Sequence, residues 1–234
     1  MKLRVDIWSD IACPWCYIGK RHLEAALAQF AHRDQVEVVW HAFELNPSSP
    51  REVERTSSYG ERLARKYGSS VAEAEQRIAR MTDIASADGL SFRFDRIKPG
   101  NTFDAHRVVH MALEHGVQDA VKERFLRAYM TEGEAIGQPD VVARLAGEAG
   151  LDAEEVREKL AIGEYVDEVR ADEEQARELG ITGVPFFVVA ERYAVSGAQP
   201  AEVLLQMLDR AWNELAEQPA PFAEGASCGP DGCD

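Results

Sequence analysis

The chain has 234 residues, of which 45% are hydrophobic and 29% charged, a balance typical of folded globular proteins and not of disordered ones. Its formal net charge of -15 argues against nucleic-acid binding, because affinity for a phosphate backbone comes largely from lysine and arginine. No stretch approaches the roughly 18 apolar residues of a membrane span, and the first residues do not resemble a signal peptide. We therefore expect a cytoplasmic protein with no membrane partner.

The chain opens with a β-α-β pattern. Residues 3–8 alternate apolar and polar side chains and predict a strand, and a helix with one apolar face follows "CPWC". Residues 36–45 predict a second strand, which ends before the breaker "NPSSP". Two strands joined by a helix indicate a parallel pair.

The middle of the chain, from about residue 59 to residue 179, is rich in Ala, Glu, Arg and Leu and has few β-branched runs. This composition predicts a long helical block. One of its helices begins near Thr102, with Asn101 as its cap and Asp104 as its third residue. The others are predicted over 59–88 with a break near Gly68, and over 118–131, 139–149, 153–162 and 164–179.

Strand character returns after the helical block. Residues 186–190 and 193–197 predict an antiparallel hairpin joined by "ER". An amphipathic helix follows over 199–218. The remaining residues, rich in Pro, Gly and Ala, predict an extended and mobile tail.

Two of the four cysteines lie in "CPWC", between the first strand and its helix. Pro14 suits the first helical turn, so Cys13 would lie at or just before that turn and Cys16 one turn further along. Unpaired backbone N–H groups and the helix dipole favour an anion there, and a thiolate is an anion. Half of a metal site and buried packing cysteines are alternatives, but a strand, C-x-x-C and helix within a β-α-β unit favour redox chemistry.

The other two cysteines, Cys228 and Cys233, are separated by the turn-forming residues "GPDG". The turn can bring the two sulfurs together. The chain between the last helix and Cys228 can extend on the order of 35 Å, enough to reach "CPWC". We weigh two hypotheses equally: a redox relay with Cys13 and Cys16, and a tail that is inert or supplies half of a metal site.

The strand-CPWC-helix start, the helical block and the later "GITGVPFF" resemble the DsbA-type branch of the thioredoxin superfamily. "DIWSDIACPWCYIGKR", "NTFDAHR" and the C-terminal cysteine pair resemble its cytoplasmic FrnE-like members, which implies a role in oxidative stress. The resemblance implies an α/β thioredoxin fold (β-α-β, then β-β-α) with a large all-helical insertion. The implied units are a thioredoxin-fold domain from 1–50 and 180–217, a helical insertion from 51–179, and a flexible tail from 218–234.

The same resemblance implies roles for individual residues. Cys13 would be the attacking thiolate and Cys16 the resolving thiol. Pro185 would be a cis proline facing them, and Val184 would offer its backbone to an extended substrate strand. A trans proline opening an edge strand is the alternative that the residues alone would favour.

Substrate contacts are implied for Pro14 and Trp15 within the motif, and for Asn101, Thr102 and His106 in "NTFDAHR". Strong DsbA oxidases carry His where this chain has Trp15, so we expect a less acidic Cys13 and a less oxidising disulfide. His106 and His110 are spaced to share a metal, but the sequence offers no third ligand, so we interpret them as ordinary core or surface histidines and assign no metal site.

Thioredoxins keep a buried carboxylate in the first strand that accepts the proton of the resolving thiol. Asp6 is the closer match, although its spacing to Cys13 is one residue longer, and Asp10 also precedes the motif. We favour solvated or capping roles for both carboxylates. The acidic helix over 164–178 is interpreted as a solvated face.

The sequence therefore predicts a thiol–disulfide oxidoreductase that reduces or isomerises protein substrates bearing thiols or disulfides. It needs no cofactor beyond its redox-active disulfides, with glutathione or thioredoxin as electron partner. One alternative is a glutathione-dependent isomerase of small aromatic or polyketide-like molecules, although such enzymes typically carry Ser where Cys13 stands. The other is a structural zinc site built from all four cysteines. Oligomeric state is left unassigned.

Overall fold

The computed structural model describes residues 2–51, 57–216, 228–229 and 232–233. The predicted β-α-β start is confirmed: β1 (Leu3–Ser9) and β2 (Val36–Ala42) pair in parallel, and α1 (Pro14–Gln29) connects them. A 3₁₀ turn (Arg33–Gln35) precedes β2. The second strand ends three residues before its predicted limit, because the N–H groups of Ala42 and Leu45 donate to side-chain carboxylates instead of a neighbouring strand.

The sheet has the strand order β2-β1-β3-β4. The predicted antiparallel hairpin is formed by β3 (Phe186–Val189) and β4 (Tyr193–Ser196), and β3 also pairs antiparallel with β1. The turn lies one residue earlier than predicted. The loop between the strands has three residues, 190–192, and its first two, Ala190 and Glu191, have positive φ values of 53° and 55°.

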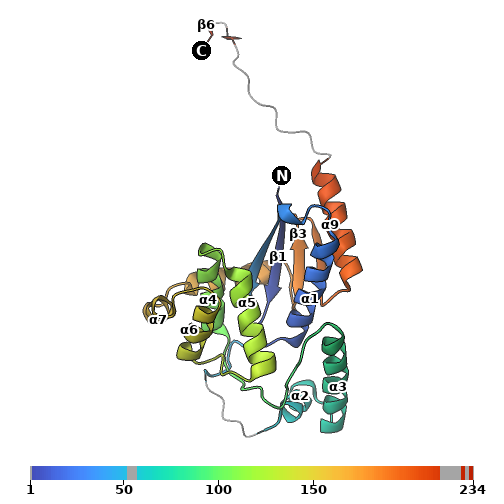
Figure 1. Ribbon diagram of the computed structural model, residues 1–234, viewed down its shortest axis with the longest axis vertical. Helices are drawn as coiled ribbons and strands as arrows, with labels where there is room; N and C mark the ends of the chain where they lie inside the picture. Colours follow the sequence, from blue (N-terminus) through green and yellow to red (C-terminus); the bar gives the residue numbers. More distant parts are fainter. Residues whose placement is uncertain (1, 52–56, 217–227, 230–231, 234) are drawn as a thin grey trace.

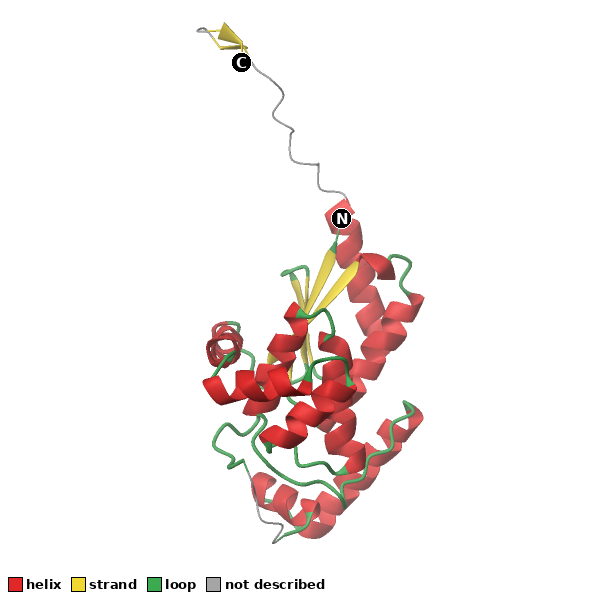
Figure 2. Cartoon of the chain, turned by 60° about the vertical axis from the view of Figure 1, so that its left-hand side comes forward, coloured by secondary structure: helices red, strands yellow, loops and turns green. Residues whose placement is uncertain are grey.

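Alternation along β1 gives the sheet two different faces. Leu3, Val5 and Ile7 point into the main core, beneath α1 and α9 (Ala201–Ala216), which pack against each other. Trp8 lies in a second apolar cluster on the opposite face, with residues of α8 (Val166–Glu178) and β3. Figures 1 and 2 show the sheet between these helices.

Between β2 and β3 the chain is helical, as predicted, and the α/β thioredoxin-like fold with an inserted helical block is confirmed. The helical segments are α2 (Tyr59–Tyr67), α3 (Val71–Ala87), α4 (Phe103–Glu114), α5 (Gln118–Arg127), a π-helical turn (Ala128–Glu132), α6 (Pro139–Glu148), α7 (Ala153–Ile162) and α8. None of the helices in the described ranges combines the length and apolar character that crossing a membrane requires.

The break near Gly68 is confirmed. Gly68 ends α2 in the left-handed conformation at φ 62°, where a side chain would be strained. Both α2 and α3 begin with a capping box, Ser58 with Glu61 and Ser70 with Glu73, which satisfies the first free N–H groups of each helix. Each S-x-x-E pattern is visible in the sequence.

The predicted start of the next helix is wrong by one residue. Thr102 occupies the N-cap position of α4, and Asn101 instead accepts a hydrogen bond from the Phe103 N–H at 2.8 Å. Asp104 is therefore the second helical residue and forms ion pairs with Arg107 and Arg51 in place of a capping box. The side chain of Asn101 also reaches back toward the segment that follows β2.

At the C-terminal end, β5 (Cys228–Gly229) and β6 (Gly232–Cys233) pair antiparallel, with Cys228 directly opposite Cys233. This pairing of the residues on either side agrees with the turn that the sequence predicts between the two cysteines. The prediction of an extended, mobile tail over 218–234 falls mostly outside the described residues.

Candidate active site around Cys13 and Cys16

The two motif cysteines lie at the N-terminus of α1. Cys13 is the N-cap residue, Pro14 is the first helical residue, and the Cys16 N–H donates to the Cys13 carbonyl at 3.1 Å. Both are free thiols and both are buried: Cys13 is 4% exposed and Cys16 is fully enclosed. The positive end of the helix dipole therefore faces the more accessible sulfur.

The segment before β3 faces Cys13. The Val184–Pro185 peptide bond is cis, as the resemblance implied, and the Cys13 thiol donates to the Val184 carbonyl at 3.5 Å. Gly19 makes the close approach of α1 to this segment feasible. A Cβ atom at Gly19 would lie 2.9 Å from Pro185 and 3.3 Å from Phe187, so any larger residue would push the helix away from the cis proline.

The surroundings of Cys13 favour its protonated thiol over the thiolate when both motif cysteines are reduced. The hydrogen-bonded Cys16 thiol and burial raise the pKa of Cys13 well above its usual value, and the negative charge of Asp10 adds to this effect. The Cys16 N–H opposes them and lowers the pKa of Cys13. A thiolate at Cys13 therefore needs a nearby positive charge or a change in its surroundings.

Asp10 lies directly before the motif. The expectation of solvated or capping roles for Asp6 and Asp10 is wrong for solvation, because both are buried, whereas the Asp10 side chain does accept the Ala12 N–H at 3.2 Å just before the helix. Asp10 is 1% exposed, and its backbone carbonyl accepts from the Cys13 N–H at 3.3 Å. Burial raises the pKa of Asp10, but hydrogen bonds from His106, Leu45 and Thr102 outweigh it and leave that pKa below its usual value. Asp10 is thus a buried anion held beside the cysteines.

Two of the predicted substrate contacts serve this carboxylate. His106 is 1% exposed and lies with Nε2 3.4 Å from Asp10, and burial lowers the pKa of His106. Thr102 is 4% exposed and also hydrogen-bonds Asp10. Because both side chains are enclosed by protein, they position Asp10 and present no surface to a substrate.

Lys122, on α5, brings a positive charge to the same region. Its side chain is fully buried, its ammonium donates to the Ser9 carbonyl at 3.1 Å, and it lies 5.5 Å from the Trp40 ring centroid. Burial lowers the pKa of Lys122 to about 8, against the opposing charges of Cys16, Asp10 and Cys13. An ammonium in this place stabilises a thiolate at either cysteine.

We predict that Lys122→Met raises the apparent pKa of the first thiol to ionise by roughly one unit, because a nearby positive charge is removed from a buried site. Thiolate absorbance in a pH titration measures the change. The Lys159→Met variant removes a partly exposed lysine from α7 and serves as the matched control. Equal thiol pKa values in Lys122→Met and the wild type would contradict the assignment.

The remaining predicted contacts lie around the motif. Trp15 is 41% exposed, so it offers an apolar surface next to Cys13, whereas Pro14 is buried. Asn101 donates to a Glu44 carboxylate oxygen at 3.1 Å and to the Pro47 carbonyl at 3.4 Å, and so fixes the loop that follows β2. Among the motif residues, Trp15 is the one available to a bound partner.

A separate buried network joins the sheet to the helical block. His41 on β2 lies 2.6 Å from Asp172 and 2.7 Å from Asp6, and His110 lies 2.7 Å from Asp172. Carboxylates only accept hydrogen bonds, so both His41 nitrogens donate and the ring is positively charged. Trp8 stacks on this ring at 4.5 Å. Asp6 thus pairs with His41 and is not solvated.

Burial lowers the pKa of His41, but hydrogen bonds to Asp172 and Asp6 outweigh it and raise that pKa to about 9. The same contacts, with that of His110, hold the pKa of Asp172 well below its usual range against the effect of burial. Asp172 belongs to the acidic segment interpreted as a solvated face, and that interpretation fails at this position. His106 and His110 bind different carboxylates, and no cluster of three or more potential metal ligands occurs among the described residues.

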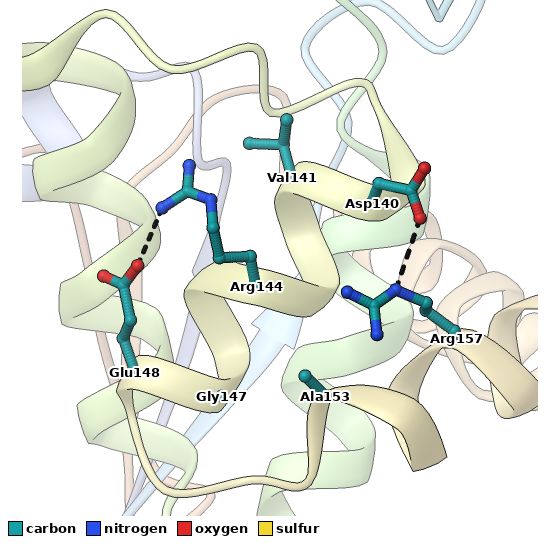
Figure 3. Close-up of a pocket in the computed structure, with 7 residues that line it drawn as sticks. All are labelled: Asp140, Val141, Arg144, Gly147, Glu148, Ala153 and Arg157. Carbon is teal, nitrogen blue, oxygen red and sulfur yellow. Dashed lines mark hydrogen bonds and ion pairs between the residues drawn. The ribbon is translucent and has the colours of Figure 1, made fainter.

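A cavity of about 620 Å³ lies between α6 and α7 (Figure 3). Its lining residues are far from the cysteine motif in the sequence, and neither Cys13 nor Cys16 is among them. Its two arginines point in from different helices, and each is held by a carboxylate: Arg144 by Glu148, and Arg157 by Asp140. None of the predicted site residues lines this cavity. We therefore place the candidate site at Cys13 and Cys16.

Gly19, Lys122 and the position of Asp10 were not predicted from the sequence. Gly19 stands three residues after Cys16 in "CYIGK", and a glycine inside a helix is itself a sign of close packing. Lys122 gives no such sign, because lysine is common on helices and only the fold places it under the motif.

Comparisons with known proteins agree with this geometry. The family described as DSBA-like thioredoxin domain matches residues 4–209. The crystal structure of a probable DsbA oxidoreductase from Streptomyces coelicolor is 46% identical with a TM-score of 0.87, covering 99% of this chain and 98% of that one. Protein YwbO of Bacillus subtilis is 26% identical over 87% of this chain and 94% of its own length. A 2-hydroxychromene-2-carboxylate isomerase, 14% identical with a TM-score of 0.66 and covering 93% of this chain and 100% of that one, shares the fold alone.

Proposed function

Since the chain belongs to the DSBA-like thioredoxin domain family, we propose that it is a thiol–disulfide oxidoreductase in which Cys13 attacks and Cys16 resolves. One observation carries the proposal: two free thiols lie at a helix N-terminus, with the Cys13 thiol bound to the carbonyl before a cis proline. Fold alone would not support it, because this fold serves several chemistries.

The exchange proceeds in two displacements. The Cys13 thiolate attacks one sulfur of a substrate disulfide, a Cys13–substrate bond forms, and the other substrate sulfur leaves as a thiolate. Cys16 then attacks Cys13, which releases the substrate dithiol and leaves a Cys13–Cys16 disulfide. Lys122 stabilises the thiolates that form. The reverse sequence oxidises a substrate dithiol.

We infer that an extended protein segment binds between Val184 and Trp15. The Val184 carbonyl accepts from the Cys13 thiol, and this bond is given up when the thiol ionises, which leaves the carbonyl for a substrate N–H. Trp15 supplies apolar contact from the other side of the sulfur. Main-chain hydrogen bonds of this kind favour protein substrates with little sequence preference.

We also propose a direction of electron flow and a cellular compartment. Reduction or isomerisation in the cytoplasm, with glutathione or thioredoxin as electron partner and a role in oxidative stress, follows from the FrnE-like resemblance and from the absence of a cation at Trp15. No further cofactor and no nucleic-acid partner are proposed.

Catalysed reduction of insulin, and reactivation of scrambled ribonuclease, test the function. We expect the wild type to accelerate both reactions over the thiol reductant alone. Stimulation of a small-molecule isomerisation by glutathione, with no effect on either protein, would instead favour the isomerase alternative, which the thiol at Cys13 disfavours. One tightly held zinc per chain, lost on mutation of either cysteine pair, would favour the structural alternative.

The second cysteine pair is proposed as a relay, supported by the direct cross-strand position of Cys228 and Cys233. In the double variant Cys228→Ser/Cys233→Ser, we expect the Cys13–Cys16 disulfide to form and to be reduced several-fold more slowly than in the wild type. The rate at which Cys13 attacks a small-molecule disulfide should be unchanged. Stopped-flow measurement of the two steps separates them. An unchanged rate of both steps removes the relay.

A further inference from the structure

We propose that a cationic pocket beside the cysteines binds the carboxylates of an acidic peptide segment that carries the reacting disulfide. The pocket has a volume of about 430 Å³ and is lined by Leu45, Asn46, Arg62, Arg65 and Lys66. The inference rests on the proposed function and specifies which substrates that site prefers.

The three cations come from one face of α2. Residues 62, 65 and 66 stand at i, i+3 and i+4, the spacing that puts helical side chains side by side. Within the described part of the chain, none of the three forms an ion pair with a carboxylate. Glu61, the nearest acidic residue on α2, is engaged in the capping box with Ser58, so the three adjacent cations, unpaired among the described residues, make a locally positive site in a chain of net charge -15.

Arg62 is held in place for such a role. It donates to the Ser57 carbonyl at 2.6 Å, and its guanidinium lies 5.6 Å from the Tyr59 ring centroid. Its guanidinium forms no other hydrogen bond with the residues that the structure describes, which leaves further N–H groups for a ligand. A guanidinium offers a planar fork that matches a carboxylate, which an isolated lysine does not.

The side of the pocket formed by Leu45 is connected to Cys13 by hydrogen bonds. The Leu45 N–H donates to the Asp10 side chain at 2.8 Å, and the Asp10 carbonyl accepts from the Cys13 N–H. On the α2 side, burial and then the charge of Cys13 raise the pKa of Tyr59, which is consistent with a Tyr59 side chain near the thiol. The pocket and Cys13 therefore belong to one continuous region.

The length of α2 determines how far from the reacting cysteine the acidic residues of the substrate must lie. From Tyr59 to Lys66 the helix rises about 10 Å, and an extended peptide advances about 3.3 Å per residue. A carboxylate roughly two to four residues from the substrate cysteine therefore reaches the cations. Leu45, which lines the pocket, and Trp15, within the motif, are 37% and 41% exposed and can give apolar contact to the same substrate.

A set of peptide disulfides tests the proposal. Each nine-residue peptide carries one central cysteine as its disulfide with pyridine-2-thiol, flanked at the second to fourth positions on both sides by Asp, Asn or Lys. Attack by Cys13 forms the Cys13–peptide disulfide, breaks the peptide–pyridine disulfide and releases pyridine-2-thiolate, whose absorbance gives the rate. With the reduced full chain at low salt, we expect the Asp peptide to react about tenfold faster than the Asn peptide. High salt should remove most of this difference, since the Debye length falls to about 3 Å at 1 M.

Two charge-reversal variants localise the effect. Arg65→Glu/Lys66→Glu is expected to reverse the order, so that the Lys peptide reacts fastest. Arg77→Glu/Arg80→Glu makes the same charge change on exposed positions of α3 and should keep the wild-type order. Equal rates for the three peptides with the wild type, or the same reversal in both variants, would overturn the pocket and leave the proposed function standing. If no peptide reacted faster than in the Cys13→Ser variant, the proposed function itself would fail.

Discussion

The Cys13→Ser variant is expected to reduce insulin no faster than the uncatalysed reaction, because a serine hydroxyl is not ionised near neutral pH and cannot attack a disulfide. Cys13 stands at the helix N-cap, and Cys16 is fully enclosed beneath it. The loss should therefore be complete and not partial, since Cys16 cannot take over the first displacement.

The matched variant Cys16→Ser retains the attacking sulfur but cannot complete the cycle. We expect it to consume one equivalent of substrate disulfide and then to stop, unless an added thiol resolves it. Thermal unfolding of both variants controls for folding, because serine fits either position in size. Full insulin reduction by Cys13→Ser would overturn the assignment of the attacking thiol.

The Asp172→Asn variant is expected to lower the free energy of unfolding by about 3–5 kcal/mol, the cost of removing one partner from a buried ion pair. Asp172 accepts hydrogen bonds from His41, His110 and the Ala42 N–H, all in a buried region. The amide leaves the charged His41 ring without its closest counter-ion. Urea denaturation of the wild type and the variant measures the difference.

The dependence of this loss on pH identifies its cause. The pKa of His41 is raised to about 9 in the folded protein, so its ion pairs stabilise the fold fully below about pH 6.5 and are lost as the pH rises through 9. The difference in the free energy of unfolding between the wild type and Asp172→Asn should therefore become smaller as the pH rises from about 6.5 to 9. A gap that stays constant from pH 6 to 9.5 would mean that lost packing, and not lost charge, destabilises the variant.

The control for Asp172→Asn is Glu174→Gln, on the same helix. Glu174 pairs with Arg177 at the surface, where ion pairs contribute less than about 1 kcal/mol. We expect its stability to lie within about 0.5 kcal/mol of the wild type at every pH.

Most of the fold could be predicted because its elements are encoded locally. Alternation over residues 3–8, the apolar face after "CPWC" and the Gly68 break each appear within a few residues of sequence. The differences lie at the ends of elements. The start of α4 moved by one residue because Asn101 bonds the Phe103 N–H as a turn residue and not as the N-cap. Strand β2 ends at Ala42 because the N–H groups of Ala42 and Leu45 donate to Asp172 and Asp10, which come from other parts of the chain.

The site could be predicted only in part, for the same reason. Cys13 and Cys16 are neighbours in sequence, and their place at a helix N-terminus follows from Pro14. The charges that tune them come from far away: Lys122 is more than a hundred residues from the motif, and no local pattern distinguishes it from a surface lysine. The cis bond before Pro185 was accessible through the family resemblance alone, since the sequence near it also fits a trans proline.

The most direct test is to trap the proposed mixed disulfide. Cys16→Ser protein, mixed with a reducible protein substrate and quenched with acid and an alkylating reagent, is digested and analysed by mass spectrometry. We expect a substrate peptide disulfide-linked to the peptide that contains Cys13, with the link absent in Cys13→Ser/Cys16→Ser. A covalent link found at Cys228 or Cys233 with Cys13 fully alkylated, or no link at any cysteine, would contradict the proposed mechanism.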